Sequence, residues 1–253
     1  MCSSDLATPS GISLATEGGA NQSIGTPLIG MSKPGLASFE PAFTDELSTI
    51  MSFAFSYLQH EKTEGQDTAI EADLLGDRCG GSVYLRLTTR RIEQFEREID
   101  DTLTSEIIDG GYWLVPPQSS CSVVIAYIGA VAPQVIESCD ELNRGSPGST
   151  AVLAITSADR LHRGWMEAQR IRYRGLEKCS AQVEKLLGVI DSNARIVTVT
   201  DGHPSVLTWL GAVAGHRVCG LGVDRFGESG TPTELYQAYQ LDAQSILSAC
   251  RSS

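Results

Sequence analysis

The second half of the chain alternates short apolar stretches with longer amphipathic ones, and this alternation constrains the fold most strongly. The apolar stretches, each expected to be a strand, are 111–115, 122–128, 151–155, 195–200 and 218–223. Helices are expected between and after them, at about 132–143, 176–187, 205–214, 232–239 and 242–249. Strands that are apolar on both faces and separated by helices are typical of a mostly parallel sheet with helices on both sides. We therefore predict an α/β fold of three layers, helices–sheet–helices.

The first part of the chain is less regular. Residues 8–34 are rich in Gly, Ser, Thr and Pro and are expected to form a connecting or active-site loop. An amphipathic helix is predicted from Thr44 to Leu58, with Leu47, Ile50, Met51, Ala54, Phe55 and Leu58 on its apolar face. Residues 60–81 are polar and suggest a loop insertion, whereas 82–89 alternate as a strand does. The charged run that begins at residue 91 suggests an exposed linker between two domains.

Charge and cysteine content exclude several classes of protein. The 253-residue chain has 19 basic and 31 acidic residues and a net charge of −12, which disfavours binding to nucleic acid. It contains no apolar run of about 18 residues, so no membrane span is expected.

The seven cysteines form no C-x-x-C pair and no secretion signal precedes them, which predicts reduced thiols and a cytoplasmic location. Cys121, Cys139 and Cys219 lie in apolar runs and are expected to be buried. The four histidines are scattered, so no metal site is predicted.

Three motifs have both a functional and a structural interpretation. Residues 201–205 hold Asp, His and Ser, but a hydrolase needs such groups to converge in space, and the favoured interpretation is a structural turn. Residues 220–230 are glycine-rich, but the third glycine lies too far along for a dinucleotide fingerprint, so a tight turn followed by a helix cap is favoured. The arginine-rich stretch 160–178 suggests an exposed helix face, with docking to an acidic partner as the alternative.

A polar, glycine-containing loop is the best candidate for a functional site. The segment Glu17–Ser23 reads Glu-Gly-Gly-Ala-Asn-Gln-Ser and concentrates a carboxylate, two amides and a hydroxyl. Its two glycines allow a sharply bent backbone that can approach a ligand closely. Such a loop can hydrogen-bond a small polar substrate, although a plain surface loop remains the alternative.

The order of the segments resembles the C-terminal part of a transketolase-like, thiamine-diphosphate-dependent enzyme. Within that family, the sequence is most similar to the homodimeric type of pyruvate dehydrogenase decarboxylating component. The resemblance rests on residues 17–23, 36–43, 83–90, 110–114, 154–161 and, most specifically, the closing segment 221–230 with Glu234–Tyr236 and Asp242–Ala243. It implies the C-terminal portion of a pyrimidine-binding domain over 7–90, a linker over 91–108, and a complete transketolase C-terminal-like domain over 109–253. Residues 1–6 match what a common sequencing adapter would encode, so we expect them to be an artefact or a tail.

The resemblance also assigns site residues and cofactors. It places Glu17, Asn21 and Gln22 in a substrate or active-site loop, with Asn21 at the position of the family's histidine. An amide can hydrogen-bond but cannot transfer a proton near neutral pH. The family uses thiamine diphosphate and Mg²⁺, held by a Gly-Asp-Gly…Asn motif that this sequence does not contain. The glutamate that activates the cofactor is expected upstream, so no residue here is assigned as catalytic with certainty.

These features predict part of a 2-oxoacid (pyruvate-type) oxidoreductase that is inactive as an isolated chain. The expected partners are a second copy in a homodimer, a 2-oxoacid substrate and, in a dehydrogenase complex, an acyltransferase component. One alternative is a transketolase that transfers ketol groups between sugar phosphates. The other is a non-catalytic dimerisation or interaction module.

Overall fold

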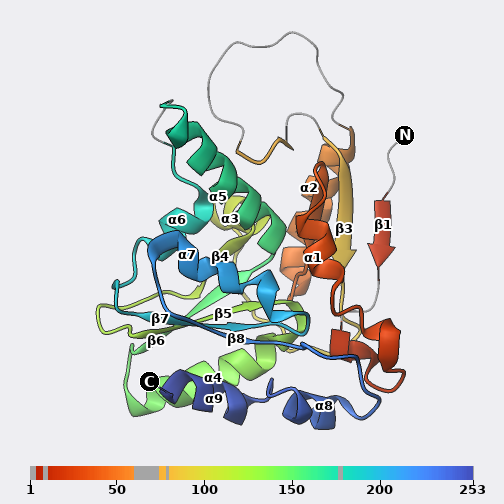
Figure 1. The fold of residues 1–253 in the computed structure, drawn as a ribbon, viewed down its shortest axis with the longest axis vertical. Helices are drawn as coiled ribbons and strands as arrows, with labels where there is room; N and C mark the ends of the chain where they lie inside the picture. Colours follow the sequence, from red (N-terminus) through yellow and green to blue (C-terminus); the bar gives the residue numbers. More distant parts are fainter. Residues whose placement is uncertain (1–3, 8–10, 60–73, 78–79, 176–178, 253) are drawn as a thin grey trace.

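The structure contains two β-sheets that lie side by side (Figure 1). It is a computed structural model that describes residues 4–7, 11–59, 74–77, 80–175 and 179–252. The larger sheet has the strand order β4–β6–β5–β7–β8 and the smaller one the order β1–β3–β2. The strands are β1 (Ser4–Ala7), β2 (Leu36–Phe39), β3 (Ser82–Arg86), β4 (Gly111–Val115), β5 (Val123–Ile128), β6 (Thr150–Ile155), β7 (Arg195–Val199) and β8 (Val218–Leu221). Only the pair β4–β6 is antiparallel, so the predicted mostly parallel sheet is confirmed.

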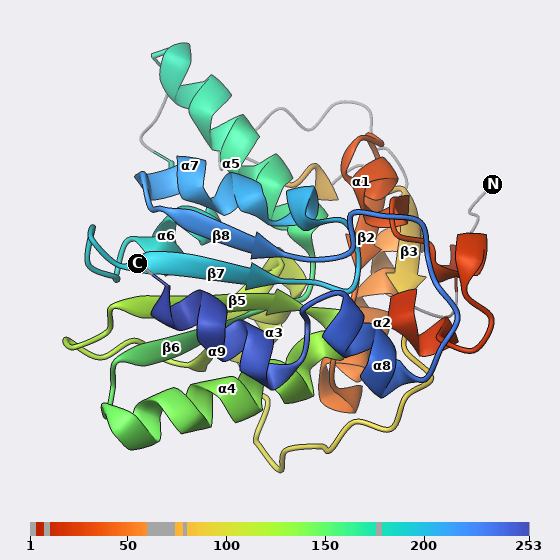
Figure 2. The same cartoon turned by 60° about the horizontal axis from the view of Figure 1, so that its bottom comes forward.

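Helices cover both faces of the larger sheet (Figure 2). They are α3 (Asp101–Asp109), α4 (Ala132–Gly145), α5 (Ala158–Tyr173), α6 (Gln182–Leu187), α7 (Gly211–Ala214), α8 (Pro232–Ala238) and α9 (Ala243–Arg251). Short 3₁₀ turns are η4 (Gly129–Val131), η5 (Pro204–Val206) and η6 (Thr208–Leu210). Because successive side chains of a strand point to opposite faces, β5 contributes to two separate cores. Ile125 and Tyr127 pack with the α4 and α9 side, while Val124 and Ala126 pack with the α5 and α6 side.

The smaller sheet is joined by two further helices, α1 (Thr26–Met31) and α2 (Thr44–Gln59), and by the 3₁₀ turns η1 (Gly11–Leu14) and η2 (Gly19–Gln22). Helix α2 forms where the sequence predicts it and buries Ile50, Ala54 and Tyr57 against this sheet. Phe55, expected on the apolar face, is 57% exposed because it lies on the opposite side of the helix from Tyr57. The core on this side is continuous with the α4 and α9 core of the larger sheet.

Backbone hydrogen bonds connect the two sheets where β2 meets the turn between β6 and α5. The amide of Glu40 donates to the carbonyl of Thr156 at 2.8 Å. The hydroxyl of Ser157 donates to the carbonyl of Ser38 at 2.5 Å, and the amide of Ser38 donates to Asp159 at 3.2 Å. The end of β2 is therefore fixed directly against the larger sheet.

The structure corrects several expected elements in the second half. Helix α5 falls in the arginine-rich stretch, where only an exposed helix face was expected, and Arg160 is fully buried there. The helix expected at 176–187 is present only as α6, with residues 176–178 outside the described part. The helix expected at 205–214 is broken into η5, η6 and the short α7. Cys121 and Cys139 are buried as expected, but Cys219 is exposed because β8 is an edge strand.

The expected linker is only partly irregular. Its last residues belong to α3, which begins at Asp101, and the side chain of the preceding Asp100 caps the helix by accepting from the amide of Leu103. The part before α3 has no regular structure but is anchored by Arg97, which donates to Asp45 at 2.6 Å and to the hydroxyl of Tyr112 at 2.7 Å. A charged segment is thus held to both α2 and β4 by its own charges. Most of the expected insertion at 60–81 lies outside the described residues.

Among the described residues, no helix combines the length and the apolar character needed to cross a membrane.

Candidate functional site

The predicted site loop is built from two short 3₁₀ turns, η1 and η2, joined at Ala15–Gly18. The structure places the three predicted residues differently. Glu17 and Asn21 are exposed, and no hydrogen bond or ion pair of their side chains to another described residue is present. Gln22 is buried, with 1% of its surface exposed. The loop therefore presents one carboxylate and one amide to the outside and uses the second amide internally.

The closing segment 221–230 holds this loop in place. The amide of Gly19 donates to the carbonyl of Gly227 at 3.0 Å, and the side-chain amide of Gln22 donates to the carbonyl of Glu228 at 3.0 Å. Gly18 has φ +64°, and a Cβ there would lie 2.4 Å from the hydroxyl oxygen of Ser229, so no other residue fits without displacement. The closing segment, which is the most specific part of the sequence resemblance, is thus in direct contact with the loop.

The other side of the loop rests on the residues that follow β7. Gly11, at the start of η1, approaches Asp201 so closely that a Cβ would lie 2.7 Å from its carboxylate oxygen Oδ2. The amide of His203 donates to the carbonyl of Ile24 at 3.1 Å. The loop is therefore held between the closing segment and the turn after β7.

Asp201 belongs to a buried charged cluster, which we call the junction triad: Glu40, Arg86 and Asp201. Nη1 of Arg86 donates to Oε2 of Glu40 at 2.6 Å and to Oδ1 of Asp201 at 2.7 Å. The three side chains are 4%, 1% and 0% exposed. Glu40 follows β2, Arg86 ends β3, and Asp201 follows β7. Ligand sites of open α/β sheets lie at the carboxyl ends of the strands, and the triad occupies that edge of both sheets.

Two carboxylates face a single guanidinium in this triad. Burial raises the pKa of the Glu40 carboxyl, and the charge of Asp201 adds to this effect, whereas Arg86 opposes it. Burial alone would lower the pKa of Arg86, but the two carboxylates outweigh it and raise that pKa. Nε and Nη2 of Arg86 and Oδ2 of Asp201 make no hydrogen bond with a residue that the structure describes. The triad is enclosed, so its role is to join the two sheets and support the loop rather than to contact a substrate.

The structure also decides between the interpretations of the other motifs. Asp201 pairs with Arg86, and His203 caps η5 by accepting from the amide of Ser205 at 3.2 Å, so the structural turn is confirmed and no Ser-His-Asp triad forms. The glycine-rich segment ends at Thr231, which caps α8 together with Glu234, as predicted. Arg160, Arg163, Arg170 and Arg172 are each paired with a carboxylate, so they do not form a free basic surface.

Sequence reasoning missed Glu40 and Arg86 as members of a charged cluster. The alternation Val83, Leu85 places Arg86 on the opposite face of β3 from the core, yet Arg86 is buried as well. The sequence signal that pointed to this cluster is the position of an arginine at the end of an apolar strand. Its partners lie 46 and 115 residues away along the chain, which no local pattern reveals.

Among the described residues, no group of three or more His, Cys, Asp or Glu side chains is placed to hold a metal ion.

Comparison with known proteins identifies the fold. No protein-family model matches the sequence, and no curated protein sequence matches it significantly. Among solved structures, the transketolase of Campylobacter jejuni matches 97% of this chain with a TM-score of 0.66 and 16% identity. The transketolase of Leishmania mexicana matches 97% with a TM-score of 0.63 and 15% identity. A split-gene transketolase, described as an inactive β4 tetramer, matches 98% with a TM-score of 0.58 and 15% identity.

The chain spans 30% of the Campylobacter enzyme, 29% of the Leishmania enzyme and 65% of the split-gene chain. At these identities the likeness establishes the fold: both sheets of this chain, in their observed arrangement, have the architecture of a transketolase segment.

Replacing Arg86 with Met tests the role of the junction triad. Removing one partner of a buried ion pair leaves uncompensated buried charge, so Arg86→Met is expected to lower the free energy of unfolding by about 3–5 kcal/mol in urea titrations. The matched control is Arg144→Met, whose exposed pair with Glu141 is expected to contribute less than about 1 kcal/mol. Adding Glu40→Gln and Asp201→Asn to Arg86→Met should restore part of the loss. Equal effects of Arg86→Met and Arg144→Met would contradict the assignment.

The raised pKa of Glu40 predicts a pH dependence. A carboxyl whose pKa is higher in the folded state contributes stability that is complete below its unfolded pKa of about 4.5 and is lost as pH rises through the folded pKa. Glu40→Gln keeps the shape and an acceptor oxygen for Arg86 but cannot ionise. The variant is therefore expected to gain stability relative to the original chain as pH rises from 4 to 8. Urea midpoints measured across this range would contradict the prediction if the difference stayed constant.

Proposed function

We propose that this chain is the C-terminal portion of a thiamine-diphosphate-dependent enzyme of the transketolase type. The observation that supports this most strongly is the match of 97% of the chain, including both sheets, to one continuous architecture in transketolase. Two of the stretches on which the sequence resemblance rests, 17–23 and 221–230, are also in contact in the structure. Because the chain spans about 30% of the matched enzymes, we propose that the cofactor and Mg²⁺ are held by the remaining part.

We propose that the loop of η1 and η2 orients the substrate. Glu17 and Asn21 point outward and their side chains bond to no other described residue, so they are available to a ligand. The carboxylate of Glu17 accepts hydrogen bonds, and the amide of Asn21 both donates and accepts but does not transfer a proton near neutral pH. Gln22 and the junction triad hold these two residues in position. The proton transfers of the reaction are therefore assigned to residues outside this loop.

Two substrate classes follow from two different observations. The structural matches favour ketol transfer between sugar phosphates, as in the transketolases themselves. The composition of the loop is less suited to a sugar phosphate, because residues 11–31 contain no Lys, Arg or His to bind a phosphate, and this keeps a 2-oxoacid of the pyruvate type as the other proposed substrate. For the second class, a homodimer and an acyltransferase component are the proposed partners.

The isolated chain is proposed to be inactive. The match to a split-gene transketolase in an inactive β4 tetramer supports this, because that protein is also a separate chain that covers this part of the fold. Isothermal titration of the chain with thiamine diphosphate and Mg²⁺ should show no binding at micromolar concentrations. Mixing the chain with a cofactor-binding portion of the same enzyme type should restore turnover of either pyruvate or xylulose 5-phosphate. Submicromolar cofactor binding by the chain alone would contradict the proposal.

The loop assignment predicts different effects for its two amides. Asn21→His in the reconstituted enzyme should change kcat by about ten-fold or more, because imidazole can transfer protons, while the free energy of unfolding changes by less than about 0.5 kcal/mol. Gln22→Ala should lower the free energy of unfolding by about 1–2 kcal/mol because it removes the buried bond to Glu228. Steady-state kinetics and urea titration check both. An unchanged kcat for Asn21→His would place the substrate elsewhere.

A further inference from the structure

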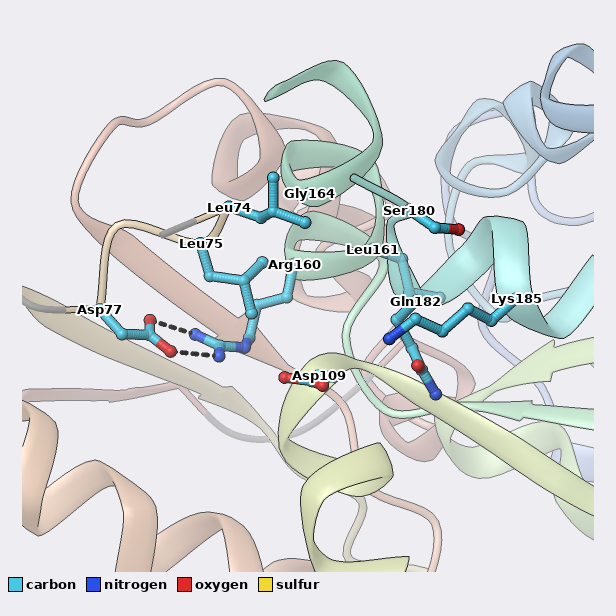
Figure 3. A pocket seen from close by; sticks show the side chains of 10 residues that line it. All are labelled: Leu74, Leu75, Asp77, Asp109, Arg160, Leu161, Gly164, Ser180, Gln182 and Lys185. Carbon is cyan, nitrogen blue, oxygen red and sulfur yellow. Dashed lines mark hydrogen bonds and ion pairs between the residues drawn. The ribbon is translucent and has the colours of Figure 1, made fainter. Parts of the chain in front are cut away.

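A cavity of about 210 Å³ lies between α3, α5, α6 and residues 74–77 (Figure 3). It shares no residue with the loop or the junction triad. The residues around it are Leu74, Leu75, Asp77, Asp109, Arg160, Leu161, Gly164, Ser180, Gln182 and Lys185. The volume is below the range of about 300–1,000 Å³ typical of drug-sized ligands, so the cavity suits a molecule of roughly ten non-hydrogen atoms.

One wall of the cavity is fixed by a buried bidentate ion pair. Arg160 is fully buried, and its Nη1 and Nη2 donate to the two carboxylate oxygens of Asp77 at 2.8 and 2.7 Å. Its Nε donates to the carbonyl of Ile108 at 2.5 Å. This arrangement holds residues 74–77 against α5 and the end of α3. The guanidinium is directed at Asp77, and its charge is largely used there.

Two charged groups that face the cavity remain unpaired within the described part of the chain. The carboxylate of Asp109 is half-buried and forms no hydrogen bond or ion pair with a described residue. Burial raises the pKa of the Asp109 carboxyl, while the charge of Arg160 and, to a lesser extent, that of Lys185 oppose this effect. The amine of Lys185, an exposed residue, has no hydrogen bond or ion pair with a described residue. Figure 3 shows the Lys185 side chain reaching across the cavity, with the Asp109 carboxylate at its lower edge. Opposite charges are thus presented to one small volume but are too far apart to neutralise each other.

Besides the polar side chains of Ser180 and Gln182, the lining contains an apolar part. Leu74 and Leu75 form one side, and Leu161 together with Gly164 of α5 forms the back. A ligand matched to this cavity has a positive group for Asp109, a negative group for Lys185 and an aliphatic part for the leucines. A simple anion does not fit because Asp109 repels it, and a simple cation does not fit because Lys185 and Arg160 repel it.

We propose that this cavity binds an aliphatic α-amino acid, with its ammonium on Asp109, its carboxylate on Lys185 and its side chain against Leu74, Leu75 and Leu161. The site does not depend on the proposed function. It provides the protein with a place for a small zwitterionic effector in addition to its substrate.

Titration calorimetry of the full chain with L-leucine tests the proposal. Saturable binding is expected with a Kd of about 0.1–1 mM, as suits a ligand of this size. Two analogues each lack one charge: 4-methylpentanoate has no ammonium, and 3-methylbutylamine has no carboxylate. Each is expected to bind at least about ten-fold more weakly than leucine, since one charged contact is lost.

Two variants then test which residue binds each charged group of the ligand. Lys185→Met should weaken leucine binding about ten-fold and leave 3-methylbutylamine binding unchanged or stronger. Asp109→Asn should reverse the preference, so that 4-methylpentanoate binds at least as tightly as leucine. This reversal would not follow from a merely structural role. Lys33→Met and Asp140→Asn, at an exposed lysine and an exposed aspartate outside the cavity, are the matched controls and should bind as the original chain does.

No saturation with leucine up to about 20 mM, far above the expected Kd, would overturn the proposal. Equal binding of leucine and both analogues would overturn it as well, because the site would then not recognise the ammonium and the carboxylate of the ligand. Equal effects of the cavity variants and the control variants would also count against it.

Discussion

One buried guanidinium, that of Arg86, joins the two sheets, and the arrangement of the rest of the molecule depends on it. It ends β3 and donates to carboxylates at the ends of β2 and β7. Removing charges from water costs several kcal/mol per ion, so each carboxylate is tolerated there only while the guanidinium is in place. The smaller sheet therefore cannot shift relative to the larger one without exposing or unpairing a charge. Asp201 in turn supports Gly11 and, through it, the start of the loop that carries Glu17 and Asn21.

The sequence predicted the large sheet because its strands are apolar on both faces, a pattern that depends on local composition alone. The arginine-rich stretch was predicted to be an exposed helix face, which holds for Arg170 and Arg172 but not for Arg160. Arg160 is neutralised by Asp77, which lies 83 residues earlier, and Arg172 by Glu184 on the next helix. The prediction of one continuous helix after β7 was wrong for a related reason. Pro204 starts a 3₁₀ turn, and Gly211 lies close to Val218 of β8. Packing against β8 therefore interrupts the regular helical periodicity. In each of these cases, contacts with residues distant in the sequence determine the observed structure.

The candidate site likewise has a part that local sequence composition predicts and a part that depends on tertiary partners. The exposed part of the loop could be predicted because Gly, Asn, Gln and Glu within seven residues are a compositional signal of a polar, bent backbone. The supporting part could not, because Glu40 and Arg86 each look like an ordinary residue at the end of a strand. Asp201 was correctly expected in a turn, but its partner is Arg86, 115 residues away, rather than the neighbouring His203.

The division between loop and support bears on how substrate preference can arise in this fold. The triad and the closing segment hold the loop through backbone contacts and buried charges that involve neither Glu17 nor Asn21 side chains. These two side chains can therefore vary without loss of the architecture. Under the proposed function, residues outside the loop would neutralise an anionic group on the substrate, because the loop itself contains no Lys, Arg or His.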